Sequence, residues 1–199
     1  MLTTSSAALF VLGTSVVLIM PGPTNTLLAA AGLKQGVRRA AKLTAAELAG
    51  YLVSISVWGH FLAHAANSLT WLPTLVRTLC CLYIAYLALR MWRTAVAFSS
   101  APQATVGLRT LFVATLLNPK AILFAGTIFP ATAFAAWSAY LQAMAIFAAL
   151  LIPIGLAWIM FGAALGGGKL KWARPERVQR CASVVLATFC VSLAWTLFH

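Results

Sequence analysis

The chain contains six long apolar segments separated by short connections, and this pattern restricts its fold more than any other feature of the sequence. The segments lie at residues 7–31, 44–66, 70–92, 108–134, 138–165 and 181–198. A helix needs about 20 apolar residues to cross the hydrocarbon core of a bilayer, and each segment is close to that length. We therefore expect an all-α, polytopic membrane protein with six transmembrane helices and the lipid bilayer as its solvent.

The composition agrees with a membrane protein and leaves no length for a soluble catalytic domain. Hydrophobic residues make up 62% of the 199 residues and charged residues 8%, whereas a soluble domain carries about 25% charged residues. The sequence also lacks a Ser/His/Asp constellation, paired carboxylates and a cofactor fingerprint. We expect a protein that is not an enzyme and that uses no cofactor.

The net charge of +12 is explained by basic residues on one side of the membrane rather than by a nucleic-acid-binding surface. Twelve of the 14 basic residues lie at every second connection, in clusters at residues 34–42, 90–109 and 169–180. Because Lys and Arg accumulate on the cytoplasmic side, both termini are expected outside and no nucleic acid is expected as a partner. The first 31 residues contain no Lys or Arg, so we expect the first helix to be retained rather than removed as a signal peptide.

The chain divides near residues 99–105 into two halves, 1–99 and 100–199, with three apolar segments each. Because three is an odd number, the second half is inverted in the membrane relative to the first. Inverted three-helix repeats are the architecture of many secondary transporters, in which the substrate lies between the repeats and broken helices line the site. We therefore expect a broken helix at a corresponding position in each half.

Proline motifs occur at both expected positions. Pro21, Gly22 and Pro23 interrupt the first segment, and Asn118 and Pro119 interrupt the fourth. Each motif ends one half-helix and starts the next, because proline lacks an N–H group and fits the first helical position. Two helix N-termini directed at one cavity would attract an anion, so we expect a substrate with a carboxylate. The alternative is that each motif merely kinks a helix.

Polar side chains follow each break, and their roles stay open at this point. A cation as deep in the bilayer as Lys120 costs of order 3 kcal/mol without a partner, so Lys120 either serves a substrate carboxylate or is a structural partner of Glu47. Asn25 either binds the carboxylate or satisfies carbonyl groups freed by the break. The expected substrate-binding residues are Pro21, Gly22, Pro23, Thr24, Asn25, Asn118, Pro119 and Lys120.

Glu47 is the one acidic residue within an apolar segment. Thr44, Tyr51 and Ser54 share its helix face at helical spacing, which gives a narrow polar stripe. Glu47 could bind a substrate ammonium group, take up a proton for coupling, or stay solvated at the membrane surface. Glu47 and Tyr51 are the candidates for coupling or ammonium binding.

Two rival functions remain. His60 and His64 are four residues apart and would serve a metal-ion exporter, the first rival. They lack a third ligand and point away from Glu47, so we expect no metal site. Arg77 lies within snorkelling distance of the outer surface and is interpreted as structural. The second rival is a membrane-embedded enzyme or a subunit that transports nothing.

The residues around the breaks belong to longer motifs. These are Pro21-Gly22-Pro23-Thr24-Asn25 with the continuation from Leu27 to Arg39, the stretch from Leu82 to Arg90, and Asn118-Pro119-Lys120-Ala121-Ile122-Leu123-Phe124 with Pro130 downstream. In this order, and with six spans, they resemble the first, third and fourth helices of the lysine exporter and homoserine/threonine exporter family (LysE/RhtB type). The resemblance extends through nearly the whole chain. It implies a bacterial inner-membrane exporter of amino acids or close relatives, driven by an ion or proton gradient.

We therefore expect a secondary transporter that exports amino acids or related small zwitterionic carboxylates, coupled to the proton gradient. The substrate would lie between the two breaks, and alternating access would come from one repeat rocking against the other. Substrate identity and the formation of a homo-oligomer stay open.

Overall fold

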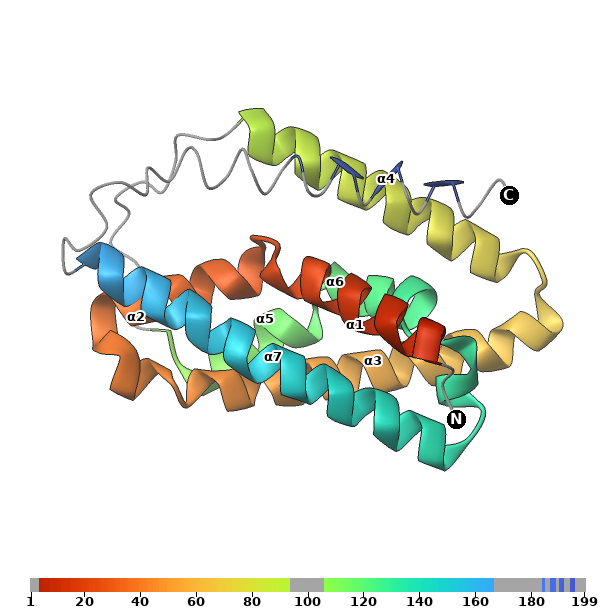
Figure 1. The fold of residues 1–199 in the computed structure, drawn as a ribbon, viewed down its shortest axis with the longest axis horizontal. Coiled ribbons are helices and arrows are strands. Elements are labelled where there is room, and N and C mark those ends of the chain that lie inside the picture. Colours follow the sequence, from red (N-terminus) through yellow and green to blue (C-terminus); the bar gives the residue numbers. More distant parts are fainter. Residues whose placement is uncertain are drawn as a thin grey trace.

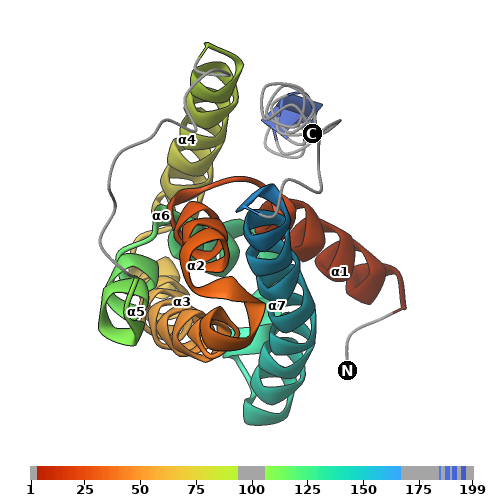
Figure 2. The same ribbon diagram turned by 90° about the vertical axis from the view of Figure 1, so that its left-hand side faces the viewer.

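The computed structural model describes residues 4–93 and 106–166, and near the C-terminus residues 184, 187–188, 190–191 and 194–195. The elements are α1 (Thr4–Ile19), α2 (Pro23–Ala40), α3 (Leu43–Ser68), α4 (Leu72–Arg93), α5 (Leu108–Leu116), α6 (Pro119–Leu123), the π-helix η1 (Phe124–Ile128), the 3-10 helix η2 (Ala131–Phe134) and α7 (Trp137–Gly166). Figures 1 and 2 show α1, α2, α3, α5, α6 and α7 gathered into one bundle, with α4 at its edge. The all-α class is confirmed for the described part of the chain.

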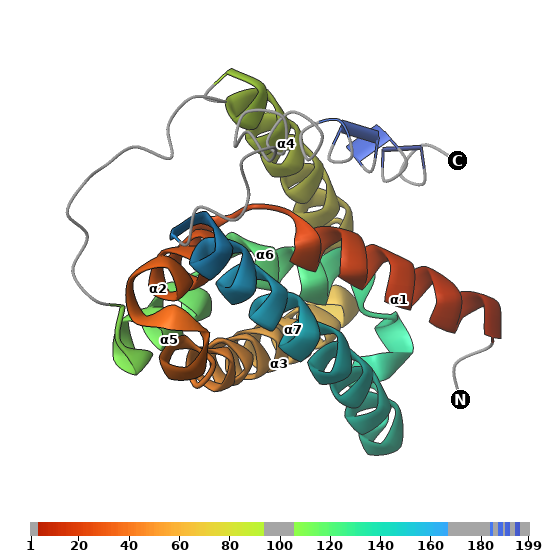
Figure 3. The same ribbon diagram turned by 60° about the vertical axis from the view of Figure 1, so that its left-hand side comes forward.

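The first and fourth apolar segments are both broken at their proline motifs, as the sequence predicted. The axes of α1 and α2 are bent by 57°, and α5 is bent by 46° against the stretch Pro119–Ile128. Figure 3 shows the change of direction between α1 and α2. The cause is the same at both breaks: Pro23 and Pro119 lie in the first turn of the new helix, where the missing N–H leaves no hydrogen bond unmade.

The helix that follows the first break is longer than predicted. α2 continues to Ala40 and bends at Gly36, whose φ of 72° favours glycine. Lys34, Arg38 and Arg39 therefore lie on the last turns of α2 rather than in a loop. Basic side chains are favourable there because the C-terminal end of a helix dipole is negative.

The number of spans is only partly supported. By length and hydropathy, one described helix, Trp137–Gly166, is suited to cross a membrane, and up to three spans result if each bent pair counts as one. α3 and α4 are helices at the second and third predicted segments. The segment 181–198 and the basic cluster at 169–180 lie largely outside the described residues. Six spans in two inverted repeats therefore stay a prediction.

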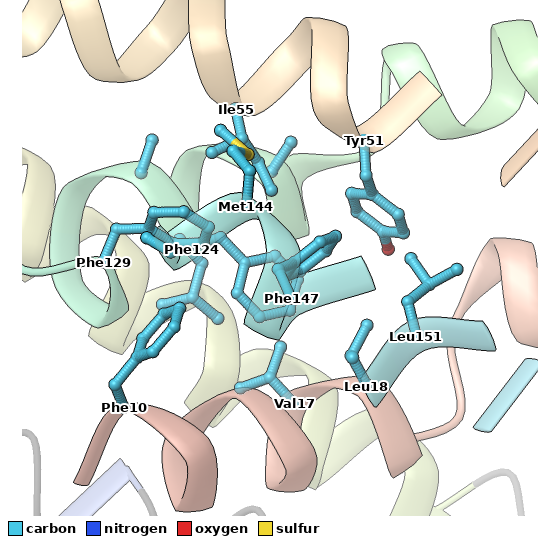
Figure 4. Packing of buried hydrophobic residues seen from close by; sticks show 14 of the residues in the cluster. Phe10, Val17, Leu18, Tyr51, Ile55, Phe124, Phe129, Met144, Phe147 and Leu151 are labelled. Atoms are coloured by element: carbon cyan, nitrogen blue, oxygen red, sulfur yellow. The ribbon is translucent and has the colours of Figure 1, made fainter. Parts of the chain in front are cut away.

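Aromatic side chains from several elements fill the centre of the bundle (Figure 4). The ring centroids of Phe124 and Phe147 are 5.0 Å apart, and Tyr51 packs edge-on against each of them at 5.7 Å. Phe10 of α1 packs against Phe129, just after η1, at 5.0 Å. Edge-to-face contacts of this kind add to the energy of burial. The two broken helices are therefore held against α3 and α7.

Glycines bring the backbones of α2 and α7 into direct contact. A Cβ atom on Gly32 would lie 2.0 Å from the carbonyl oxygen of Ile159, and one on Gly162 would lie 1.8 Å from that of Ala29. Neither position has room for a side chain. Small residues drive membrane helices together in this way, because close backbones maximise van der Waals contact. The contact holds α2, and with it the first break, against α7.

This packing predicts that Gly162→Ser destabilises the protein by about 1–3 kcal/mol, the usual cost of forcing extra atoms into a packed core. The measurement is the thermal unfolding midpoint of purified protein in detergent micelles. Gly107→Ser is the matched control, because a Cβ there meets nothing within 4 Å and serine suits its N-cap position. Equal midpoints for the two variants would contradict the α2–α7 contact.

Candidate functional site

The second break begins with a capped helix. Asn118 precedes α6 with an extended backbone, and its Oδ1 accepts a hydrogen bond from the backbone N–H of Lys120 at 3.1 Å. Pro119 stands in the first turn. The helix-start chemistry predicted for these residues is confirmed. One donor of this helix end is therefore used by its own cap.

The first break has the same backbone plan without a side-chain cap. Gly22 is the N-cap of α2 in an extended conformation, Pro23 stands in the first turn, and no side chain caps the helix. The N–H groups of Thr24 and Asn25 belong to the first turn, which has no intrahelical acceptors for them. Both side chains are buried. α2 therefore directs the positive end of its dipole into the protein interior.

Asn25 satisfies carbonyl groups that the break leaves free. Its Nδ2 donates to the carbonyl oxygens of Leu18 at 2.6 Å and Met20 at 2.8 Å, at the end of α1. Of the two roles left open for Asn25, the structure shows the one in which its amide pairs with carbonyl groups freed by the break. The amide thereby ties the start of α2 back to the end of α1.

Lys120 reaches from the second break to the first. Its Nζ donates to the carbonyl oxygens of Val17 at 3.0 Å and Met20 at 2.7 Å, and the residue is 1% exposed. Gly22 makes room for this side chain, because a Cβ there would lie 3.0 Å from both Cε and Nζ. A Cβ at Gly22 would therefore require the end of the Lys120 side chain to shift, whereas the extended backbone of Gly22 suits any residue.

Asn118 completes the connection between the breaks. Its Nδ2 donates to the hydroxyl of Tyr51 on α3 at 3.0 Å and to Oγ1 of Thr24 at 3.4 Å. The structure thus brings the predicted residues of both halves into one buried cluster. Substrate binding by these residues stays a prediction.

Glu47 adds a carboxylate to this cluster. The residue is 2% exposed, and its Oε2 has no hydrogen-bond partner. Thr24 is within hydrogen-bonding reach of the carboxylate, and Lys120 interacts with it by charge without a direct salt bridge between these two described side chains. Gly155 of α7 faces it, since a Cβ there would lie 3.0 Å from Oε2. The burial argues against a carboxylate solvated at the membrane surface.

The polar stripe predicted on α3 is buried along its length, at Thr44, Glu47, Tyr51 and Ser54. Ser54 Oγ donates to the carbonyl oxygen of Leu116 at 2.9 Å and so caps the end of α5. The sequence placed Ser54 on the stripe but did not reveal this partner. The position of Gly155 opposite Glu47 was also missed, because a glycine in an apolar helix carries no sign of a carboxylate facing it.

The whole cluster is closed to solvent in this conformation. Thr24, Asn25, Glu47, Asn118 and Lys120 are all buried. A small molecule could reach the start of α2 or Glu47 Oε2 only if the elements around the two breaks moved apart. The described conformation of this cluster is therefore a closed one.

Other candidates lie away from this cluster. His60 and His64 are exposed on α3, and His60 Nδ1 contacts the carbonyl oxygen of Ser56 at 2.9 Å. Within residues 4–93 and 106–166 and the few described C-terminal positions, no group of three or more His, Cys, Asp or Glu side chains could hold a metal ion. Arg77 lies on α4, and its side chain is outside the described residues.

Comparison with known proteins gives a family match over most of the chain. The model of a family described as LysE type translocator matches residues 15–199. This range includes both breaks and every candidate site residue. No curated protein and no solved structure matches the chain.

Removing the Asn25 amide is predicted to destabilise the protein. Asn25→Ala leaves the buried carbonyl of Leu18 without its donor, at a cost of about 1–3 kcal/mol, and lowers the unfolding midpoint in micelles. Thr26→Ala is the control, since Thr26 is exposed and the carbonyl of Gly22 keeps the backbone N–H of Thr26 as its donor. A midpoint for Asn25→Ala as high as that of the control would show that the amide does not stabilise the break.

Proposed function

Because the chain belongs to the LysE type translocator family, and so to membrane proteins that transport rather than catalyse, we propose that it is a secondary transporter of amino acids. In this proposal it exports amino acids or related small zwitterionic carboxylates across the bacterial inner membrane and is driven by the proton gradient. The observation that carries the proposal is the buried meeting of two broken helices around Lys120, Asn118 and Thr24.

The start of α2 is the proposed carboxylate site. Its N-terminus carries the positive end of a helix dipole and no side-chain cap, whereas the N-terminus of α6 is already capped by Asn118. Thr24 and Asn25 offer backbone donors at this end, which is how a helix N-terminus binds small anions. The two helix ends are therefore unequal, and the first is the better binding site.

Glu47 is the proposed partner of the substrate ammonium group. Its Oε2 is buried without a hydrogen-bond donor, which is costly unless a cation or a proton reaches it. Thr24 lies close to both the Glu47 carboxylate and the Tyr51 hydroxyl, so the carboxylate and ammonium sites adjoin. A zwitterion has its two charges a few bonds apart and would therefore engage both neighbouring groups.

The same carboxylate accounts for proton coupling. A proton and a substrate ammonium would compete for Glu47 Oε2, because either one relieves the unpartnered oxygen. Protonation from the acidic outer side would then release the amino acid outward, and loss of the proton to the cytoplasm would restore the site for another substrate. Net exchange of one substrate for a proton follows from this competition.

The proposed transport cycle uses the expected topology of six spans in two inverted repeats, 1–99 and 100–199, with both termini outside. The two breaks belong to different halves, and the cluster that joins them is closed. Rocking of one half against the other would open the cluster to one side at a time. Assembly into a homo-oligomer is compatible with this cycle but is not required by it.

The test of transport is efflux of labelled amino acids from vesicles that contain the purified protein, with and without an inward proton gradient. We expect efflux of at least one amino acid. Lys120→Ala should reduce that efflux by at least about tenfold, because one hydrogen bond to a charged group contributes about 1.5–3 kcal/mol and about 1.4 kcal/mol corresponds to a factor of ten. Lys34→Ala, on the exposed end of α2, is the matched control. No efflux of any tested amino acid by the folded protein would refute the proposal.

A second prediction concerns pH. Glu47→Gln keeps the shape of the side chain but neither binds a proton nor attracts an ammonium group, so efflux should lose its dependence on the pH gradient. Glu176→Gln changes the other acidic residue of the chain and should leave the dependence unchanged. The measurement is the initial efflux rate at several external pH values. A pH profile for Glu47→Gln that coincides with that of the unmodified protein would remove Glu47 from the coupling mechanism.

A further inference from the structure

The end of α1 presents three carbonyl oxygens to side-chain donors. The last turn of a helix leaves its carbonyl groups without intrahelical donors, and here those of Val17, Leu18 and Met20 turn toward the interior. The negative end of the α1 dipole lies at the same point. Carbonyl oxygens at the end of a helix dipole form the kind of site that binds a cation.

The ammonium group of Lys120 fills this site. Nζ lies 3.0 Å from the carbonyl oxygen of Val17 and 2.7 Å from that of Met20. The Asn25 amide donates to the carbonyl oxygen of Leu18 and also to that of Met20, which thus accepts from both side chains. Lys120 enters from another helix, 103 residues away from Val17 in sequence. The ammonium group therefore binds the end of α1 as a cation from another helix, and not as a capping group from the neighbouring sequence.

One charged side chain faces the Lys120 ammonium from a neighbouring helix. Glu47 on α3 interacts with Lys120 by charge and balances it, and the other ionisable groups near this pair are Tyr51 on α3 and, beyond it, Tyr83 on α4. Gly22 leaves the space in which Cε and Nζ lie. Among the described residues, Lys120 and Glu47 are the charged side chains in the buried core.

We propose that the carbonyl oxygens of Val17 and Met20 form a monovalent-cation site, and that the Lys120 ammonium is its built-in occupant. The protein thus carries its own ion at the break between α1 and α2. Two consequences follow. Transport needs no sodium or other inorganic cation at this site, and a substrate ammonium finds the end of α1 already filled and must use Glu47 instead.

The test replaces the tethered cation with a free one. Lys120→Ala removes Cγ, Cδ, Cε and Nζ, and n-propylammonium supplies the same atoms. We expect n-propylammonium, at a few times its Kd, to raise the unfolding midpoint of Lys120→Ala by about 2–4 °C and to leave the unmodified protein unaffected, because its site is occupied. Tetramethylammonium, which cannot donate a hydrogen bond, and 1-propanol, which lacks the charge, should have no such effect.

The transport arm rests on the function proposed above, whereas the stability arm does not. In vesicles, n-propylammonium should raise efflux by Lys120→Ala about threefold or more, and exchanging potassium for sodium should not change efflux by the unmodified protein. Stabilisation without any transport would retain the cation site and refute the transport function. Stabilisation by 1-propanol to the same extent, or a sodium requirement of the unmodified protein, would overturn the cation site.

A second variant covers the case in which Lys120→Ala does not fold. Lys120→Met keeps an aliphatic chain of similar length and loses the charge, so its packing is nearly unchanged. We expect a lower midpoint than for the unmodified protein, because the carbonyls of Val17 and Met20 lose their donor. A Lys120→Met protein that is as stable and as active as the unmodified one would refute the proposal.

Discussion

The hydrogen bonds from the Lys120 ammonium to the carbonyl oxygens at the end of α1 are the interaction on which the site depends. A bilayer offers no water to backbone groups, so a helix that breaks inside it must find partners for the carbonyl and N–H groups that the break frees. Lys120 and Asn25 supply donors to α1, and Ser54 supplies one to α5. The carbonyl groups at the ends of α1 and α5 are therefore paired by side chains from α2, α6 and α3, whereas the N-terminus of α2 has no side-chain cap.

A few buried side-chain atoms have no hydrogen-bond partner, and these atoms indicate where a ligand would bind. In the part of the chain that the structure describes, the buried side-chain atoms without a partner are Oγ1 of Thr14 and Oε2 of Glu47. Glu47 lies beside the start of α2, the helix end that has no side-chain cap. An unpaired carboxylate oxygen beside an uncapped helix N-terminus is an arrangement suited to a zwitterion.

Much of the site was predictable because local chemistry controls it. Pro23 and Pro119 act on their own helix turns, and the Asn118 cap reaches only to Lys120 N, so the sequence around each break is sufficient to place it. The polar stripe with Glu47 and Tyr51 followed from helical spacing, whereas its burial is shown only by the structure. The length of α2 was not predictable from hydropathy, because its polar last turns remain helical beyond the apolar run and past Gly36. Packing against α7 stabilises α2, and this packing leaves no pattern in the local sequence from which it could be predicted.

The sequence by itself determined the membrane setting, the helical class and the two points at which helices break. These properties depend on residue type and on neighbours within a few positions. Only the tertiary structure decided what Lys120 and Glu47 meet. The partners of Lys120 lie 100 and 103 residues away, and Glu47 faces Gly155 of α7. Such contacts depend on how the helices pack. The close approach of α2 and α7 at Gly32 and Gly162, for example, comes from the fit of two surfaces that no single stretch of sequence contains.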